Sequence, residues 1–441
     1  MPRPTVTSPK RSKSLIRAQR LPVRDSPGNS TVGILISFRY IIVMLLWNLN
    51  IRHLRALAAI CRLGSVSAAA QTIGLSQPAV TQGMARLELQ LGRTLFERRK
   101  EGMIPTEAGA ILCAQSEKAM AILSGGIRRA RGAGSGVADA YQLVTMAQLR
   151  ALIALADAGS YISASAATGL SQPSLHRAVR ELEAASGLTL FVRRGRGVAI
   201  TSAGRIVVRA FRLARNELQN GLYEIAALEG PAVGRIVIGA MPLARAKLLP
   251  HAVARFHAAH PEVQIDIVDG QQAGLTEQLR EGDLDFLVGA LPYSSPGKGI
   301  EQKWLFDDPL VVIARADHPL VDGGNTLPPW QELARYSWVV DRQGTPMRRT
   351  WENLFTEAGV DPPRARVTSR SLLAIRALLL EGDYLALLNL GQVALDVDNG
   401  LISIIGAPLP DASIPVGITY RTGWEPTPLQ REFLQDIDAE I

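Results

Sequence analysis

Gly74-Leu75-Ser76-Gln77-Pro78 is repeated as Gly169-Leu170-Ser171-Gln172-Pro173, 95 residues further along the chain. The repeat extends without a gap over residues 54–110 and 149–205, where roughly two positions in five are identical. Self-similarity at a fixed shift is the sequence signature of a duplicated structural unit. We therefore interpret the two blocks as copies of one domain.

Each copy has the pattern of a helix, a tight turn and a second helix. The repeated glycine suits a helix end, the serine suits a helix N-cap, and the proline suits the first helical turn. Apolar residues recur at intervals of three and four, which is typical of amphipathic helices. They are Leu149, Leu152, Ile153, Ala156, Leu175, Val179 and Leu182 in the second copy, and Val80, Met84 and Leu87 in the second helix of the first.

A short apolar run, basic residues and glycine follow each second helix, at residues 95–102 and 190–200. This pattern predicts a small β-hairpin, or wing. Polar groups on the second helix can contact base edges in a major groove, while wing arginines hold the phosphate backbone. The predicted DNA-contacting residues are Ser171, Gln172, Ser174, His176, Arg177, Arg180, Arg193, Arg194 and Arg196 in the second copy, and Ser76, Gln77, Thr81, Gln82, Arg86, Arg98 and Arg99 in the first.

The alternative for these blocks is a pair of generic helical hairpins with solvated basic faces. The agreement of turn, cap, inward positions and wing in both copies favours the DNA-binding interpretation. Gly83 lies in the middle of the first copy's second helix and is expected to weaken it by roughly 1 kcal/mol relative to Ala.

Charge is distributed unevenly along the 441 residues. Residues 1–230 contain 30 Lys and Arg against 13 Asp and Glu, a net charge of +17, whereas residues 231–441 contain 18 against 27, a net charge of −9. A basic N-terminal half and an acidic C-terminal half indicate a nucleic-acid-binding module joined to a module with another task. The alternative is a basic face that has no nucleic-acid partner.

Cys61 and Cys113 are the only two cysteines. They form neither a disulfide framework nor a metal-type pair, so we expect both to pack as small apolar residues in a cytoplasmic protein. His251, His257 and His260 lie close together in the sequence, but surface histidines far outnumber metal ligands. We predict no metal site and no cofactor.

The first 50 residues consist of a basic stretch and then an apolar run at residues 34–49. The run is too short and too interrupted to span a membrane comfortably, and no small-residue cleavage site follows it. We interpret residues 1–50 as a disordered tail or a mis-set translation start, with Met44 as the alternative start. We expect no membrane association.

The second copy resembles the DNA-binding head of the LysR-type transcriptional regulators. That head carries a Ser-Gln-Pro turn, a Leu-Glu helix end, a Leu-Phe-Arg-Arg wing and a Thr-x-Ala-Gly start to a long linker helix. The matching residues are Ser171-Gln172-Pro173, Leu182-Glu183, Leu190-Phe191-Val192-Arg193-Arg194 and Thr201-Ser202-Ala203-Gly204. Residues 149–441 resemble a complete member. The first copy resembles an additional head, which departs from the family's single one.

The resemblance implies a multidomain fold. It has two all-α-rich winged helix-turn-helix domains and a C-terminal two-lobed α/β effector domain similar to periplasmic solute-binding proteins. The expected parts are an extension at 1–50, the first head and its helix at 51–130, a flexible linker at 131–145, the second head at 146–204, a linker helix at 205–230 and the effector domain at 234–441.

An apolar stripe runs along the expected linker helix from Ile206 to Ile225. In the family this helix pairs two subunits, and the stripe here is long enough to do so. The resemblance therefore implies a homodimer or homotetramer. The alternative is that the stripe packs only against the heads of its own chain.

Beyond residue 234 the sequence alternates between strands and helices, which indicates an α/β fold. The expected strands are residues 235–241, 263–268, 286–290, 337–340, 364–368 and 384–388. Ligands in such sheets lie where strands end and helices begin, because free N–H groups there favour an anion or a polar oxygen. The matching positions, and the predicted effector contacts, are Met241, Pro242, Leu243, Ala244, Gln343, Gly344, Thr345, Ser369 and Ser371.

The stretch Met241-Pro242-Leu243 is less polar than many relatives show at this turn, so a bulkier or more apolar effector than a small carboxylate is expected. The alternative for each predicted contact is ordinary turn and cap chemistry.

The sequence predicts a bacterial regulator that binds double-stranded DNA and whose operator binding is modulated by a small-molecule effector. The alternative is a solute-binding component of a transport system, suggested by the C-terminal half alone. The two heads and the lack of a convincing export signal count against it. No Gly-x-Ser-x-Gly elbow, metal constellation or phosphate loop supports an enzyme.

Overall fold

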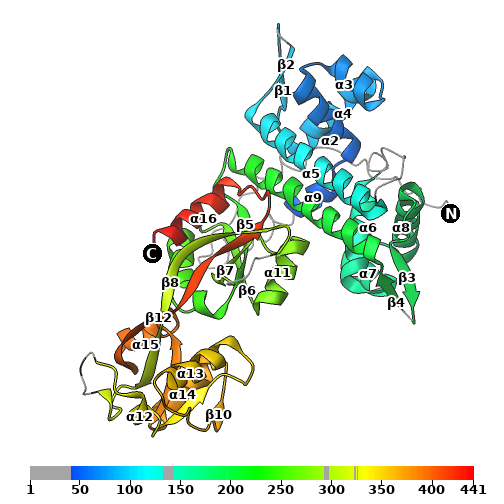
Figure 1. The fold of residues 1–441 in the computed structure, drawn as a ribbon. Helices are drawn as coiled ribbons and strands as arrows, with labels where there is room; N and C mark the ends of the chain where they lie inside the picture. Colours follow the sequence, from blue (N-terminus) through cyan, green and yellow to red (C-terminus); the bar gives the residue numbers. More distant parts are fainter. Residues whose placement is uncertain are drawn as a thin grey trace, which may run out of the picture. The chain divides into compact units, whose positions relative to one another are not determined.

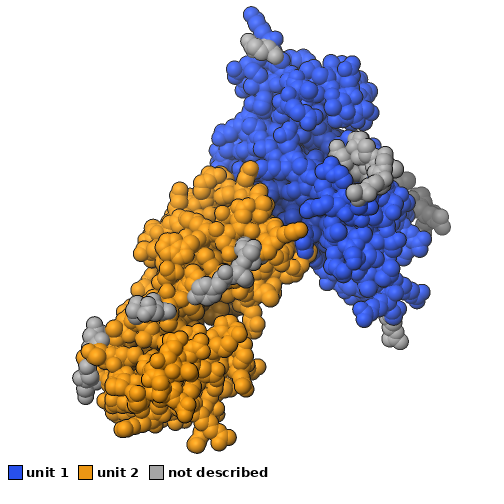
Figure 2. All heavy atoms as spheres, viewed as in Figure 1, with its two compact units in different colours: residues 1–234 blue, residues 235–441 orange. Residues whose placement is uncertain are grey.

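The computed structural model describes residues 41–100, 102–132, 144–195, 197–292, 297–321, 324 and 326–441. The predictions for residues 1–40, for most of the 131–145 linker and for Arg196 lie outside these residues. The chain divides into two compact units, residues 1–234 and residues 235–441 (Figures 1 and 2).

The first unit contains two copies of one arrangement, which we call head 1 and head 2. Each head has three helices and a two-stranded antiparallel wing, and a long linker helix follows each wing (Figure 1). Head 1 and its linker helix comprise α2 (Ile51–Leu63), α3 (Val66–Ile73), α4 (Gln77–Leu91), β1 (Phe96–Arg99), β2 (Gly102–Pro105) and α5 (Glu107–Arg131). Head 2 and its linker helix comprise α6 (Met146–Ala158), α7 (Tyr161–Thr168), α8 (Gln172–Ser186), β3 (Phe191–Arg194), β4 (Gly197–Ile200) and α9 (Ser202–Ala227).

The repeated Gly-Leu-Ser-Gln-Pro stretch forms the turn between the second and third helices of each head. Gly74 and Gly169 adopt φ values of 68° and 69°, a left-handed conformation that favours glycine. The hydroxyl oxygens of Ser76 and Ser171 accept hydrogen bonds from backbone N–H groups in the first turns of α4 and α8. The predicted helix-turn-helix is confirmed in both copies.

The same hydrogen bonds attach both wings. The Oε1 atoms of Glu88 and Glu183 accept from the backbone N–H groups of Leu95 and Leu190, each at 2.8 Å. The Leu-Glu helix end therefore has a structural role, because its carboxylate fixes the start of the wing. After each wing a threonine caps the linker helix and donates its hydroxyl to a carbonyl in the preceding loop, at 2.7 Å in both copies.

The linker helices α5 and α9 pack against each other (Figure 1). Their buried stripes occupy equivalent positions: Leu112, Ala119, Leu123 and Ile127 in α5, and Val207, Ala214, Leu218 and Leu222 in α9. Within one chain the α9 stripe is already packed against another helix. Its partner is α5 of the same chain, because the first copy supplies a second linker helix.

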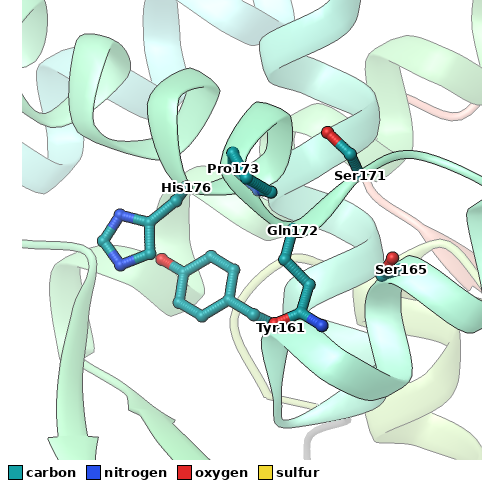
Figure 3. A pocket seen from close by; sticks show the side chains of 6 residues that line it. All are labelled: Tyr161, Ser165, Ser171, Gln172, Pro173 and His176. Atoms are coloured by element: carbon teal, nitrogen blue, oxygen red, sulfur yellow. The ribbon is translucent and has the colours of Figure 1, made fainter.

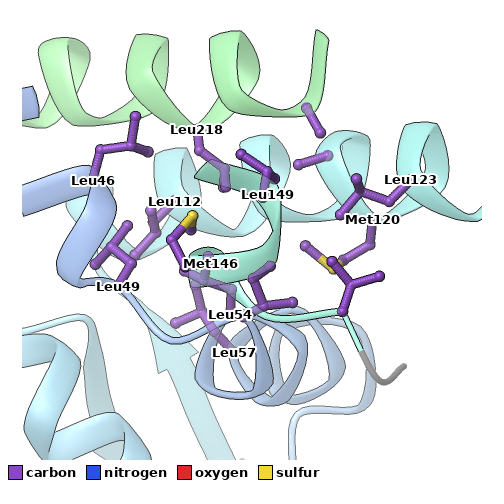
Figure 4. Close-up of a cluster of buried hydrophobic side chains, with 14 of the residues drawn as sticks. Leu46, Leu49, Leu54, Leu57, Leu112, Met120, Leu123, Met146, Leu149 and Leu218 are labelled. Carbon is purple, nitrogen blue, oxygen red and sulfur yellow. The ribbon is translucent and has the colours of Figure 1, made fainter. Parts of the chain in front are cut away.

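One hydrophobic core runs through the whole first unit. Residues of both heads and both linker helices belong to it, including Leu57 of head 1 and Leu149 of head 2 (Figure 4). Burial of this continuous apolar surface is the main force that holds the two heads together.

Residues 41–50 belong to this core, contrary to their assignment to a disordered or mis-set extension. Ile41–Asn48 form a helix, Ile42, Leu46 and Leu49 are buried, and Trp47 lies under the guanidinium of Arg150 in head 2. This helix was not predicted from the sequence, because its apolar run follows a basic stretch and together they resemble an N-terminal tail. Among the described residues no single helix is long and apolar enough to cross a membrane. This helix and α2 together have the length and composition of a span, but they are bent by 83° relative to each other.

Cys61 and Cys113 form a disulfide, which corrects the expectation of two unpaired packing residues. Cys61 lies in the last turns of α2 and Cys113 lies on α5, and these two helices pack against each other. The disulfide therefore joins head 1 to its linker helix. Two cysteines 52 residues apart carry no spacing signal, so only the packing of the helices reveals the pair.

The second unit is built on one eight-stranded mixed sheet, with strand order β10-β9-β11-β8-β12-β7-β5-β6. Its elements are β5 (Gly234–Ala240), the 3₁₀ turn η2 (Pro242–Ala244), α10 (Leu248–Ala259), β6 (Val263–Asp269), α11 (Gln272–Glu281), β7 (Phe286–Ala290), β8 (Ile300–Arg315), α12 (Trp330–Leu333), β9 (Ser337–Val340), α13 (Pro346–Glu357), β10 (Val367–Thr368), α14 (Leu372–Leu380), β11 (Tyr384–Asn389), α15 (Leu390–Asp398), β12 (Ile402–Arg421) and α16 (Pro428–Asp438).

The unit has two lobes, joined by the long antiparallel strands β8 and β12 (Figure 1). The first lobe packs β5, β6 and β7 with α10, α11 and α16, and the second packs β9, β10 and β11 with α12 to α15. The predicted two-lobed α/β domain is confirmed. The expected strand at 364–368 is shorter than predicted, because only Val367 and Thr368 pair with β9.

Candidate nucleic-acid interface and ligand site

The third helix of head 2, α8, turns its apolar residues inward and its polar residues outward. Leu175, Val179 and Leu182 are buried in the core. Every described residue of the predicted set in head 2 is exposed: Ser171, Gln172, Ser174, His176, Arg177, Arg180, Arg193 and Arg194. The structure therefore presents hydroxyl, amide, imidazole and guanidinium groups together on one side of α8, the chemistry that reads base edges.

The first turn of α8 is held in a fixed arrangement (Figure 3). The hydroxyl groups of Ser171 and Ser174 share a hydrogen bond of 2.8 Å. The imidazole of His176 stacks on the ring of Tyr161 from α7, with 4.5 Å between centroids. An open hollow of about 760 Å³ lies here, lined by Tyr161, Ser165, Ser171, Gln172, Pro173 and His176. Tyr161 and Ser165 were missed from the sequence because they lie on the preceding helix.

Burial raises the pKa of the Tyr161 phenol, and the nearby carboxylate of Glu183 raises it further. The phenol is therefore neutral near pH 7 and serves as a flat support for the imidazole. Ser165 donates its hydroxyl to the backbone carbonyl of Leu170 at 2.6 Å, which fixes the turn. Both residues position the contact surface rather than extend it.

Head 1 exposes its whole predicted set as well: Ser76, Gln77, Thr81, Gln82, Arg86, Arg98 and Arg99. Its wing differs, because the guanidinium of Arg99 pairs with the carboxylate of Glu97 at 2.7 Å. The wing of head 2 has Val192 at the position equivalent to Glu97. The guanidinium of Arg99 is therefore engaged by a carboxylate of its own wing, whereas Val192 offers no such partner in head 2.

Packing against His53 explains why head 1 has a glycine at position 83. A Cβ atom at this position would lie 2.9 Å from Cδ2 of His53, so the imidazole packs directly on the backbone of α4. Burial lowers the pKa of His53, and the positive charge of Arg86 lowers it further. In head 2 the equivalent residues are Ala178 and Gln148.

In the second lobe the predicted ligand residues gather at the ends of parallel strands. Gln343, Gly344 and Thr345 lie between β9 and α13, and Ser369 and Ser371 lie between β10 and α14. The hydroxyl oxygens of Thr345 and Ser371 cap α13 and α14 by accepting backbone N–H groups. Helix capping was the alternative to ligand contact for these residues, and both caps are present in the structure.

In the first lobe the predicted residues follow β5. The side chain of Met241 packs over Gly289 of β7, and Ala244 is fully buried, so the side chain of Ala244 cannot contact a ligand. Pro242 and Leu243 keep exposed surface. The turn η2 contacts α15 of the second lobe, so the strand ends of the two lobes face each other.

Asp308 was missed by the sequence analysis, and it lies on the long strand β8 between the lobes. Its carboxylate accepts the backbone N–H of Gly391 at the start of α15, at 3.0 Å, and its carbonyl accepts the amide of Asn389 at 2.9 Å. Burial raises the pKa of Asp308 to about 6, although the Gly391 bond opposes that rise. The stretch Asp307-Asp308-Pro309 gives no sequence signal of such a position.

A second hollow, of about 570 Å³, opens in the second lobe. Only Gln343 of the predicted set lines it. Two arginines line it, Arg348 and Arg364. Arg348 is paired with Glu352 at 2.7 Å and stacks over Trp351, 4.8 Å from the ring centroid. Ser369 and Ser371 do not line this hollow, although their neighbour Thr368 does. Among the described residues no group of three or more His, Cys, Asp or Glu side chains is placed to hold a metal.

Comparisons with known proteins agree with this architecture. The model of the bacterial regulatory helix-turn-helix protein of the lysR family matches residues 51–110 and 146–205, and that of the LysR substrate binding domain matches residues 229–440. A full-length OxyR variant from Pseudomonas aeruginosa is 25% identical with a TM-score of 0.50, covering 66% of this chain and 97% of that one.

Two regulators show how far the similarity extends. The HTH-type transcriptional regulator PcaQ of Agrobacterium fabrum is 30% identical over 65% of this chain and 91% of its own length. The HTH-type transcriptional regulator GalR of Pseudomonas putida is 32% identical over 85% of this chain and 93% of its own length. Because the match to GalR spans 85% of this chain, it must include at least part of the first helix-turn-helix copy. The chain belongs to the LysR family, and it is a DNA-binding transcriptional regulator with two helix-turn-helix segments and an effector-binding domain.

Proposed function

We propose that this regulator binds its operator mainly through α8 and the wing of head 2, and that head 1 adds a weaker set of contacts. The observation that carries the proposal is the outward row of polar groups on α8, with Arg177 and Arg180 exposed one turn apart. An arginine that reaches a base edge with two hydrogen bonds discriminates by roughly 1–3 kcal/mol. Because DNA is the partner, a cytoplasmic location belongs to the same proposal.

The effector in this proposal is a small molecule bound between the facing lobes. The start of α14 offers a polar end to the ligand, and the Met241 to Leu243 turn offers an apolar surface to its body. Such a molecule alters DNA binding only if it binds the DNA-competent state and the free state with different affinity. The predicted contacts Gln343, Gly344, Thr345, Ser369 and Ser371 supply the polar side of this site.

The sequence led us to expect a homodimer or homotetramer. The stripe of α9 is occupied by α5, so in this proposal chains associate through other surfaces. A homodimer of this chain would carry four heads. Light scattering of the full chain, with and without DNA, measures the number of chains in the complex.

The experiment that tests the proposed function is a titration of labelled promoter fragments with the full chain. We expect sequence-specific binding whose affinity falls steeply with salt, because basic side chains displace counterions from phosphates. Absence of any preference for a promoter fragment at low ionic strength, with and without metabolite extract, would overturn it.

The ligand site is tested separately by thermal shift with a panel of aromatic and aliphatic carboxylic acids. Gln343→Ala should weaken the response to any acid that stabilises the protein. Gln435→Ala, an exposed glutamine on α16, is the matched control and should leave the response unchanged. Equal responses of the two variants would remove Gln343 from the site.

A further inference from the structure

We infer that a single chain reads a complete operator made of two different half-sites in inverted orientation. This inference rests on the proposed function and deepens it, because it states which DNA the two heads take. It is carried by the geometry of α5 and α9 together with the different residues that the two heads expose.

The contacts between the linker helices follow a two-fold rule. A Cβ atom on Gly126 of α5 would collide with Ala210 of α9, and one on Gly221 of α9 would collide with the side chain of Gln115 of α5. Gly221 is equivalent to Gly126 by the 95-residue shift, and Ala210 is equivalent to Gln115. Exchange of partners between equivalent positions is the mark of a two-fold interface. Here both halves of that interface belong to one chain.

The ends of the linker helices obey the same rule. Arg131, the last residue of α5, donates from Nε to the carbonyl of Ser186 in head 2, at 2.6 Å. Glu229, just after α9, pairs with Arg93 in head 1. Ser186 ends α8, and Arg93 lies just after α4. Each linker helix therefore ends beside the third helix of the opposite head.

The two heads are consequently fixed relative to each other by the shared core and by these crossed ends. Two-fold related heads read two half-sites that run in opposite directions, separated by about 10 base pairs or a multiple of that helical repeat. A head that is already positioned binds its half-site without a second association step. One chain therefore has the geometry that otherwise needs two subunits.

The half-sites must differ, because the exposed surfaces of the third helices differ. At five exposed positions head 1 has Ala79, Thr81, Gln82, Ala85 and Arg86 where head 2 has Ser174, His176, Arg177, Arg180 and Glu181. Glutamine suits an adenine edge and arginine suits a guanine edge. A symmetric operator would match one head and present the wrong base edges to the other.

The test is selection of binding sites from a random duplex library with the full chain. We expect a motif of two unlike halves in inverted orientation. A perfect palindrome, or a single half-site, would overturn the inference while leaving sequence-specific binding intact. Failure to enrich any motif would instead overturn the proposed function, so the two failures are distinguishable.

A head-swapped variant sharpens this test. The five exposed residues of head 1 are replaced by those of head 2, and the buried residues and Gly83 are kept: Ala79→Ser, Thr81→His, Gln82→Arg, Ala85→Arg and Arg86→Glu. We expect the selected motif to become a palindrome of the half-site read by head 2. An unchanged motif would show that head 1 does not read DNA, and the inference would fail.

The fixed geometry is tested at α5. Gly126→Leu forces α5 away from α9, and we expect at least a tenfold loss of affinity for the selected duplex. Gly125→Leu is the matched control, because nothing lies within 4 Å of a Cβ atom there. Thermal unfolding confirms that each variant is folded. Equal affinity of a folded Gly126→Leu protein and the control would overturn the requirement for coupled heads.

Discussion

Head 1 and head 2 share a scaffold but differ in what joins and covers it. The hydrogen bonds that fix the wing and cap the linker helix recur with nearly the same lengths in both heads. Head 1 joins α2 to α5 with the Cys61–Cys113 disulfide, whereas head 2 has Ala156 and Val208 at the equivalent positions. The two heads therefore share their side-chain hydrogen bonds to the backbone but differ in core packing and surface residues. Many apolar side chains can fill a core, whereas few groups can satisfy a buried N–H.

The largest effect is expected from removing the disulfide, which is present in head 1 and has no equivalent in head 2. The crosslink closes a loop of about 52 residues, and a loop of that length corresponds to about 4 kcal/mol of folding stability in the chain-entropy model. Reductant should lower the urea midpoint of the wild type. Cys61→Ala with Cys113→Val, the residues of head 2, should match the reduced wild type and ignore reductant. A wild-type midpoint that does not move would contradict the structural role of the disulfide.

The next largest effect is expected from comparing the third helices of the two heads, α8 and α4. Arg177→Ala with Arg180→Ala should lower affinity for a promoter fragment about 100-fold or more and abolish specific protection in a footprint, since two base or phosphate contacts are lost. Arg86→Ala in head 1 should cost less than about tenfold and only trim the footprint. Equal losses would overturn our ranking of the two heads.

A smaller effect concerns the pair His53 and Gly83. Alanine usually stabilises a helix by about 1 kcal/mol relative to glycine, yet Gly83→Ala should destabilise head 1 by about 1–2 kcal/mol because its Cβ meets the imidazole. His53→Gln with Gly83→Ala, which copies head 2, should recover the loss. Urea denaturation measures both, and additive effects of the two changes would contradict direct packing.

The smallest effect is a pH dependence at His53, a position where head 2 has Gln148. Burial lowers the pKa of folded His53 below the ordinary value of 6.5, so the unfolded chain binds the proton more readily. The neutral imidazole's contribution is present above pH 6.5 and is lost as the pH falls through the folded pKa. His53→Gln should flatten this part of the stability curve below pH 6.5. Curves that stay parallel would show that His53 does not titrate as described.

Local patterns predicted the heads well. Capping residues, apolar spacing and the repeated turn each act within a few residues, so α4, α8 and both wings were found from the sequence, and the described DNA-contact candidates are all exposed. The alternating elements of the effector domain were found for the same reason. The long strands β8 and β12 were missed, because they cross between lobes and their pairing is not local.

The sequence by itself determined that two heads exist, which face of each third helix is polar and that an α/β domain follows, because periodicity and capping are properties of short segments. Tertiary structure alone decided that α9 pairs with α5, that Cys61 meets Cys113 and that Asp308 lies against α15. The reason is that an apolar stripe or a buried side chain has no intrinsic preference for one partner. The choice is made by whichever surface the rest of the chain brings within reach.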